Sequence, residues 1–230
     1  MNEVLRQEKK FLIGLSDYYR YSWNLAKLMI EDPHNLGDGY SIRSLYFDSL
    51  DDRDFQEKLD GVELRRKIRL RCYSPDSDFA LLEIKQKEGT MQKKRSLRLS
   101  RGVAARLTQG DYSGLLTCPE PLARELYAVM NIHGYRPCAV VEYRRRAFIA
   151  KENKIRVTFD HHIVATESHF DIFDRALAQY PVQDTSLVVL EVKYNGFLLS
   201  YIKDMLRECS TGEISVSKYC LSRTVGKHFI

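Results

Sequence analysis

The most basic stretch of the chain contains the residues whose types and spacing are best suited to chemistry. Lys67, Arg69 and Arg71 occupy alternate positions, and because side chains alternate along a strand, these three would share one face. The same alternation returns in residues 81–87, and a third basic run follows at residues 93–98. Such concentrated positive charge repels itself, so water or an anion must compensate it. The pattern therefore indicates recognition of a polyanion.

For any single alternating strand, the simpler interpretation is an antiparallel sheet whose polar face is solvated. Repetition favours another arrangement, since residues 141–145, 155–160 and 189–193 alternate in the same way. Many strands that each carry a charged face predict a closed antiparallel barrel with a polar lumen. The expected fold class is α+β, a barrel with peripheral helices.

The elements that must position these side chains follow from periodicity and turn signals. Further strands are predicted at residues 4–13, 40–48, 139–150, 155–164 and 187–192. Helices are predicted at residues 16–30, 53–59, 103–107, 122–130, 170–177 and 197–209. Ser16 is the expected N-cap of the first helix and Asp51 that of the second.

Length and composition are those of one folded domain spanning residues 1–230. The chain is 44% hydrophobic and 29% charged, which argues against disorder. The net charge of +5 is modest, so local clustering says more about partners than the total does. Five cysteines without a C-x-x-C pair predict reduced thiols in a cytoplasmic protein. No apolar run reaches membrane-spanning length, so we expect no membrane segment.

Common catalytic signatures are missing from the sequence. No G-x-x-x-x-G-K-[ST] loop, G-x-G-x-x-G turn or H-E-x-x-H pair occurs. His161 and His162 are adjacent on a predicted strand, so we expect them to point to opposite faces and not to share a metal. No serine or cysteine has the context of a nucleophile, although triads assemble in space and not in sequence. Polyanion chemistry remains.

Arginine forks and lysine point charges suit phosphate oxygens. The candidates are Arg69, Arg71, Arg145, Arg156, Lys10, Lys85 and Lys93. Glu8, Glu83 and Glu191 lie on the same basic strands. They could pair with the cations, which is usual, or hold a divalent metal that bridges phosphates, and we expect one carboxylate to do the second.

Seven segments of the chain, in this order, resemble the VTC domain. This is the polyphosphate polymerase domain of the vacuolar transporter chaperone complex and its bacterial relatives, within the triphosphate tunnel metalloenzyme superfamily. The segments are Tyr46-Phe47-Asp48, residues 67–71, residues 82–85, Tyr143-x-Arg145, residues 156–160, residues 190–193 and Ser217-Lys218-Tyr219. They span nearly the whole chain.

The resemblance implies a tunnel of antiparallel strands that binds ATP and transfers its γ-phosphoryl group to a growing polyphosphate chain. It implies phosphate contacts for Lys10, Arg69, Arg71, Lys85, Lys93, Tyr143, Arg145 and Arg156. Ser217 and Lys218 would flank the path of the substrate, and Glu191, with Glu8, would hold Mn²⁺ or Mg²⁺. Lys94 takes the place of Lys93 if the strand register changes by one residue.

One departure from the superfamily pattern bears on the reaction. Its hydrolases carry E-x-E-x-K on the first strand, whereas this chain has Arg6-x-Glu8-x-Lys10. A metal-binding carboxylate is replaced by a cation, which disfavours water activation and favours the polymerase branch. A second departure is Ser215, which stands where the eukaryotic pattern has a further lysine.

Two alternatives stay open. One is an inorganic or nucleoside triphosphatase of the same fold, and the other is a non-catalytic module that binds polyanions. Nucleic acid is not the expected partner, because an RNA reader exposes aromatic rings for base stacking and these tyrosines are spaced like core residues. The sequence leaves open the preferred metal, the product length, the oligomeric state and any regulatory partner.

Overall fold

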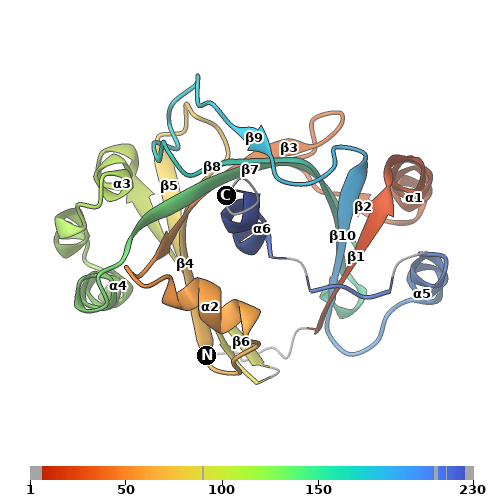
Figure 1. Ribbon diagram of the computed structural model, residues 1–230. Helices are drawn as coiled ribbons and strands as arrows, with labels where there is room; N and C mark the ends of the chain where they lie inside the picture. Colours follow the sequence, from red (N-terminus) through yellow and green to blue (C-terminus); the bar gives the residue numbers. More distant parts are fainter. Residues whose placement is uncertain (1–6, 90, 210–211, 216, 226–230) are drawn as a thin grey trace. The chain divides into compact units, whose positions relative to one another are not determined.

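The computed structural model describes residues 7–89, 91–209, 212–215 and 217–225. Figure 1 shows their helices and strands, coloured along the sequence from red at the N-terminus to blue at the C-terminus. The chain divides into two compact units, and each is described by itself. Unit 1 comprises residues 1–41, 143–163 and 183–217, and unit 2 comprises residues 42–142, 164–182 and 218–230. Three strands, β3, β7 and β8, contribute residues to both units.

Unit 1 is an antiparallel sheet in the order β1-β10-β8-β7. Its elements are β1 (Gln7–Gly14), α1 (Leu15–Leu28), β2 (Ile30–Glu31), the second half of β7 (Arg136–Ile149), η2 (Glu152–Lys154), β8 (Arg156–Thr166), β10 (Leu187–Tyr194) and α5 (Ser200–Arg207). The short strand β2 pairs with the end of β7. Side chains of α1 and α5, such as Leu25 and Ile202, pack with Leu190 of β10 in one hydrophobic core. The helices therefore cover the apolar face of this sheet and leave its polar face for charged side chains.

Unit 2 has the strand order β7-β3-β4-β5-β6. Its elements are β3 (Tyr40–Asp48), α2 (Arg53–Leu59), β4 (Arg65–Cys72), β5 (Phe79–Glu88), β6 (Met91–Ser100), α3 (Arg101–Thr108), η1 (Ser113–Thr117), α4 (Pro121–Ile132), β9 (Tyr180–Pro181) and α6 (Lys218–Val225). The strand β9 pairs with the end of β8. Neighbouring strands follow each other along the chain from β3 to β6, as expected for hairpins.

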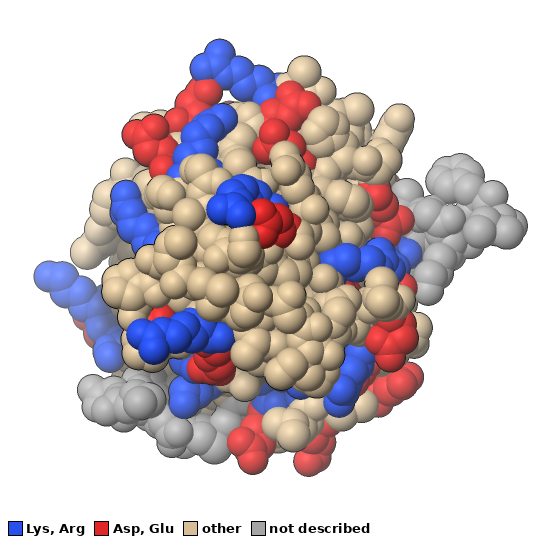
Figure 2. All heavy atoms as spheres, turned by 90° about the vertical axis from the view of Figure 1, so that its left-hand side faces the viewer, with Lys and Arg blue, Asp and Glu red and all other residues tan. Residues whose placement is uncertain are grey.

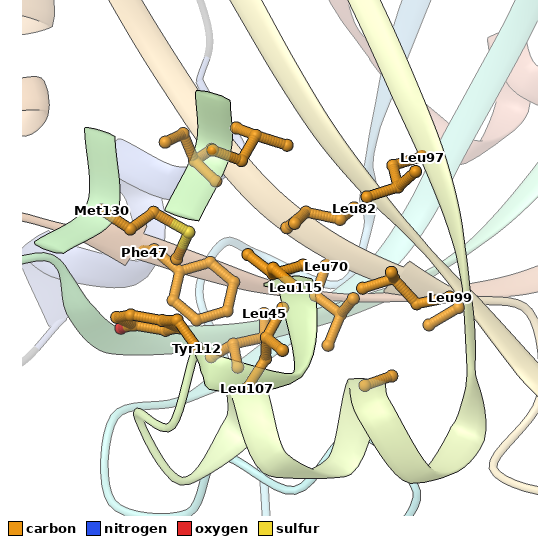
Figure 3. Packing of buried hydrophobic residues seen from close by; sticks show 14 of the residues in the cluster. Leu45, Phe47, Leu70, Leu82, Leu97, Leu99, Leu107, Tyr112, Leu115 and Met130 are labelled. Carbon is orange, nitrogen blue, oxygen red and sulfur yellow. The ribbon is translucent and has the colours of Figure 1, made fainter. Parts of the chain in front are cut away.

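The core of unit 2 explains which strand faces are left for chemistry. Leu70 of β4, Leu82 of β5 and Leu97 of β6 point to the same side and pack against helix residues such as Leu107 and Met130 (Figure 3). Burying these apolar side chains fixes the register, since a slip of one residue would expose the whole set. The alternate positions of the three strands, which carry the cations, consequently lie on the opposite face.

Within the described residues, the predicted strands and most of the predicted helices are confirmed, but two caps are wrong. Residues 4–6 of the first predicted strand lie outside the described residues. Gly14, not Ser16, stands at the N-cap of α1, and no side chain caps that helix. Asp51 does not cap α2 either. The carboxylate of Asp48 accepts hydrogen bonds from the backbone N–H groups of Asp54 and Phe55, at 2.8 and 2.9 Å. An acceptor six residues upstream is a tertiary arrangement that local capping rules do not anticipate.

Two further expectations differ from the structure. Residues 170–177 form turns and not a helix, because the side chains of Asp171 and Asp174 accept hydrogen bonds from backbone N–H groups two residues further on. The closed barrel is not confirmed: among the described residues, the strand pairings form an open path that begins at β1 and ends at β6. In the same part of the chain, no helix is long and apolar enough to cross a membrane.

Candidate functional site

Three strands of unit 2 bring together what we call the β4 cation group: Lys67, Arg69, Arg71, Lys85 and Lys94 around Glu83. The register sets Arg69 opposite Glu83 and Lys85 opposite both Lys67 and Lys94. Directly opposed residues share a face, so these side chains lie on the polar side of the sheet. The predicted phosphate-binding residues of this unit are therefore neighbours, with Lys94 in the place of Lys93.

Glu83 is the centre of the group and is only 2% exposed. The Nε atom of Arg69 donates a 2.7 Å hydrogen bond to one carboxylate oxygen, and Lys94 contacts the other. Arg71 is held separately, because its Nε atom donates to the hydroxyl of Ser44 at 3.2 Å. Glu83 thus takes the first of the two roles that the sequence allows, which is pairing with cations.

Positive charge exceeds negative charge inside this group, as two pKa shifts indicate. Burial would raise the pKa of Glu83, but the attraction of Arg69 and Arg71 and the contact with Lys94 lower it to about 2. The pKa of Lys94 is also lowered, although a lysine beside a carboxylate usually shows the opposite shift. Burial and the repulsion of Arg69 and Arg71 outweigh the bond to Glu83. A bound anion would relieve that repulsion.

Lys93, the predicted phosphate ligand, lies on the other face of β6. It is placed opposite Gln86, and its charge lowers the pKa of Glu125 on α4, which chiefly pairs with Arg95. Lys94 is the lysine beside Glu83, so the alternative register is the one that the strand adopts. The choice depends on the hairpin turn near Gly89, which the sequence pattern alone does not determine.

In unit 1, four charged residues form the β1–β10 group: Glu8 and Lys10 on β1, Glu191 and Lys193 on β10. Lys10 is paired with Glu191 in the register, and Glu8 with Lys193. The Nζ atom of Lys10 lies 2.6 Å from an oxygen of Glu8 and 3.6 Å from one of Glu191, while Lys193 contacts Glu191. Burial would lower the pKa of Lys10, yet the attraction of Glu191 and Glu8 raises it. Lys193 was not among the predicted site residues, although its position two residues after Glu191 is a signal.

The β1–β10 group fits a divalent cation with two carboxylates. The oxygens of Glu8 and Glu191 converge on one ammonium group, that of Lys10, so they already surround a single cationic centre. Carboxylate oxygens suit Mg²⁺ and Mn²⁺, and Mg²⁺ is often held by one or two carboxylates together with substrate phosphates. Among the described residues, no cluster of three or more histidine, cysteine, aspartate or glutamate side chains could hold a metal ion alone.

The two predicted site arginines of unit 1, Arg145 and Arg156, are each held by a buried carboxylate. Arg145 makes a bidentate pair with Asp160, with distances of 2.6 and 2.7 Å, and its guanidinium lies 5.4 Å from the ring centroid of Tyr143. Burial would lower the pKa of Arg145, but Asp160 raises it well above its usual value. Arg156 contacts Asp32 at 2.5 Å and donates to the hydroxyl of Tyr40 at 3.0 Å. Such pairs fix the direction of a guanidinium while leaving other donors for a ligand.

The last predicted site residues lie near the C-terminal helix. Ser217 directly precedes α6, Lys218 is its first residue, and both are partly buried. Sequence periodicity did not predict α6, which is only eight residues long. Arg6, the residue that departs from the hydrolase pattern, lies outside the described residues.

The expectation for the two adjacent histidines is wrong. The Nδ1 atoms of His161 and His162 lie 2.6 Å apart, so the side chains meet and do not point to opposite faces. The cause is the backbone of His162, whose φ of 50° interrupts the alternation of β8. The two rings hydrogen-bond to each other, and Tyr18 packs on His161.

The exposed surface over α3 and α4 shows no comparable concentration of cations. Figure 2 shows scattered lysine, arginine and acidic side chains there, separated by uncharged surface. Arg95 and Glu125, for example, neutralise each other with distances of 2.5 and 2.6 Å. The cationic strand faces, and not this outer surface, are therefore the candidate polyanion sites.

Comparisons with known proteins show which fold and which family this chain has. An antiparallel-sheet α+β structure of the same kind occurs in a proposed adenylate cyclase from Bacillus halodurans, with 12% identity, a TM-score of 0.54, and coverage of 92% of this chain and 95% of that one. Looser similarity links it to a proposed adenylate cyclase from Vibrio parahaemolyticus (10% identity, TM-score 0.45, 90% and 87% covered) and to the Mimivirus capping enzyme triphosphatase (9%, 0.40, 88% and 88%). The family model of the VTC domain matches residues 5–225, and the chain belongs to that family. No curated protein is similar enough in sequence to count as a relative.

Proposed function

We propose that this protein is a polyphosphate polymerase that transfers the γ-phosphoryl group of ATP to a growing polyphosphate chain. Membership of the VTC domain family supports the proposal. The observation that carries it is the grouping of the five cations of the β4 cation group around the single carboxylate of Glu83, an excess of positive charge that favours binding of a highly charged anion. A chain of phosphates is such an anion, since every unit carries at least one negative charge.

The β4 cation group supplies the first set of phosphate contacts in this proposal. Arg69 and Arg71 present planar forks that match two oxygens at once, and Lys85 and Lys94 add point charges. Glu83 orients Arg69 through its 2.7 Å hydrogen bond. An arginine that is already oriented loses less side-chain entropy when it binds a phosphate.

Unit 1 supplies a second set, made of Lys10, Arg145 and Arg156, with Tyr143 beside Arg145. Asp160 uses two of the five N–H donors of Arg145. The pair therefore still has donors for phosphate oxygens. Ser217 and Lys218 would contact the product chain.

Mn²⁺ or Mg²⁺ is the proposed cofactor, held by Glu191 and Glu8. When bound, such an ion neutralises charge on phosphate oxygens. Lys10 contacts both carboxylates, so its ammonium would be available to phosphate oxygens if the two carboxylates held such an ion.

The reaction needs positioning more than acid–base chemistry. An oxygen of the terminal phosphate of the chain forms a bond to the γ-phosphorus of ATP as the bond to the β-phosphate oxygen breaks, and ADP leaves. That terminal oxygen is already ionised, so no general base is required. The arginines and lysines hold both reactants and stabilise the charge that spreads over the transferred group.

A cytoplasmic location completes the proposal. Cys72, Cys118, Cys138 and Cys209 are free thiols, and Cys72 and Cys138 are buried. Free thiols persist in reducing compartments, where ATP is also available as substrate. The proposed partners are accordingly ATP and polyphosphate, and no nucleic acid.

³¹P NMR of the purified protein with ATP and Mn²⁺ tests the proposal. A polymerase produces mid-chain phosphate signals together with ADP. Arg69→Ala should abolish these signals, whereas Arg95→Ala, on the opposite face of β6, should retain them. Release of orthophosphate without mid-chain signals would replace the polymerase by a triphosphatase of the same fold. Intact ATP, even after addition of a polyphosphate primer, would leave only a binding module.

A further inference from the structure

Tyr46 occupies an unusual position beside the β4 cation group. It lies on β3 directly opposite Arg69 of β4, and its neighbours Leu45 and Phe47 point into the core. Tyr46 therefore belongs to the polar face, yet it is only 4% exposed. Arg69 donates a hydrogen bond to its hydroxyl. The guanidinium of Arg69 is consequently held on two sides, by Tyr46 and by Glu83.

A second tyrosine fixes the ring of Tyr46 in place. Tyr219 of α6 stacks on it, with a centroid distance of 5.1 Å and an interplanar angle of 27°. The hydroxyl of Tyr219 donates a 2.5 Å hydrogen bond to Asp48, the same carboxylate that caps α2. Phe55 contacts the ring of Tyr219 edge-on, with a centroid distance of 6.1 Å. The stacked pair is thus anchored to two helices and a strand.

The charged groups around this hydroxyl come from four strands, β3, β4, β5 and β6. Lys67 lies 5.6 Å from the centroid of Tyr46 and 5.5 Å from that of Tyr219, and Arg69 and Arg71 follow on β4. Glu83 and Lys94 lie beyond Arg69, and Asp48 lies beyond Tyr219. Cations are therefore the nearest charges to the Tyr46 oxygen.

We propose that Tyr46 is a positioning residue of the β4 cation group, whose hydroxyl holds Arg69 ready for a phosphate oxygen and is kept protonated by a bound polyphosphate. The inference deepens the proposed function and rests on its phosphate site. An anion on Lys67, Arg69 and Arg71 neutralises the charges that would stabilise a phenolate. A phenolate, conversely, neutralises one of those cations and competes with phosphate. By linkage, ionisation of Tyr46 weakens anion binding by the same factor by which a bound anion disfavours that ionisation.

The Tyr46 hydroxyl titrates in a pH range that solution experiments can cover. Burial would raise the pKa of Tyr46, but the attraction of Arg69, Lys67 and Arg71 lowers it to about 8. Tyr112, another buried tyrosine of the same unit, donates its hydroxyl to the backbone carbonyl of Tyr135 at 2.8 Å, and burial raises its pKa. Near pH 9, Tyr46 should therefore be ionised in the ligand-free protein while Tyr112 is not.

Calorimetric binding of inorganic tripolyphosphate at pH 7 and pH 9, without metal, tests the inference on Tyr46→Phe. The variant keeps the stacked ring and loses the hydroxyl, so at pH 7 it should bind roughly fivefold more weakly, the usual effect of one lost hydrogen bond. Between pH 7 and pH 9 the wild-type protein should lose roughly tenfold more affinity than the variant, because only the wild type must reprotonate Tyr46. Tyr112→Phe is the matched control and should follow the wild type at both pH values.

Ultraviolet absorbance at 295 nm gives an independent measurement on the wild-type protein itself. One tyrosinate should form near pH 8, disappear on addition of tripolyphosphate, and be missing in Tyr46→Phe. A tyrosinate signal that tripolyphosphate leaves unchanged, or a variant with the wild-type change in affinity between pH 7 and pH 9, would overturn the inference. Wild-type protein that binds tripolyphosphate with this proton linkage but forms no polyphosphate would leave the inference standing and refute the polymerase. Absence of any tripolyphosphate binding would refute both.

Discussion

Replacing Glu83 by glutamine should destabilise the protein and at the same time strengthen anion binding. Glutamine has the shape of a protonated glutamate, so Glu83→Gln removes the charge and little else. The shift of the Glu83 pKa from 4.5 to about 2 corresponds to about 3 kcal/mol of stability at neutral pH. Because the folded pKa is lowered, this stability is present above pH 4.5 and is lost as pH falls toward 2. The variant should lack it at every pH.

Urea unfolding at pH 7, with and without tripolyphosphate, measures both effects. Without ligand, Glu83→Gln should lose about 3 kcal/mol, since Arg69, Arg71 and Lys94 then repel one another without compensation. With ligand, the variant should recover more stability than the wild type gains, because the anion replaces the missing carboxylate. Glu125→Gln is the matched control: its partner Arg95 and its own carboxylate are solvent-accessible, so its effect should stay below about 1 kcal/mol.

Two results would refute this reasoning. A Glu83→Gln variant as stable as the wild type would mean that the carboxylate does not compensate the surrounding cations. A variant that tripolyphosphate stabilises no more than it stabilises the wild type would mean that the β4 cation group is not where the anion binds. Measuring the free energy of unfolding of Glu83→Gln with and without tripolyphosphate distinguishes these two results.

Three further predictions concern other parts of the molecule. Lys94→Ala should weaken tripolyphosphate binding roughly tenfold, the effect of a lost charge-assisted contact, whereas Lys93→Ala should change it less than about twofold. Equal effects of the two substitutions in calorimetry would contradict the strand register. Glu191→Gln should weaken Mn²⁺ binding, followed by electron paramagnetic resonance, by at least about tenfold; unchanged binding would remove Glu191 from the metal site. Burial and the nearby Asp48 raise the pKa of Asp54 to about 7. The contribution of protonated Asp54 to the free energy of unfolding is therefore fully present below about pH 4 and is lost as pH rises toward 7. From pH 5 to pH 8 the wild type should therefore lose about 3 kcal/mol more unfolding free energy than Asp54→Asn, and parallel curves would contradict this shift.

The strands and their faces could be predicted from the sequence because burial enforces them. In β4, the apolar residues Ile68 and Leu70 alternate with the basic ones, and only one assignment of faces buries the apolar set. The same argument fails where a tertiary contact decides the structure. Asp48 caps α2 and binds Tyr219, residues distant in sequence, so neither this cap nor the position of α6 is visible in local patterns.

The composition of the site could be predicted more completely than its pairing. Arginines and lysines on alternating strands identify the candidate phosphate-binding residues, but not the carboxylates that orient them. Asp160 reaches Arg145 because β8 lies next to β7, and Asp32 reaches Arg156 from the segment after β2. Those partners depend on strand order, which no residue pattern in this chain specifies.

The β1–β10 group and the β4 cation group differ in net charge. This difference predicts which group needs a metal ion to bind phosphate. The β1–β10 group has as many carboxylates as ammonium groups, so by itself it attracts phosphate weakly. A divalent ion on Glu8 and Glu191 would change that balance to a net positive charge. The β4 cation group has its excess of positive charge without any metal. We therefore expect Mn²⁺ to increase the affinity for tripolyphosphate in the wild type and in Glu83→Gln but not in Glu191→Gln, and a Mn²⁺ effect that survives in Glu191→Gln would contradict this division of roles.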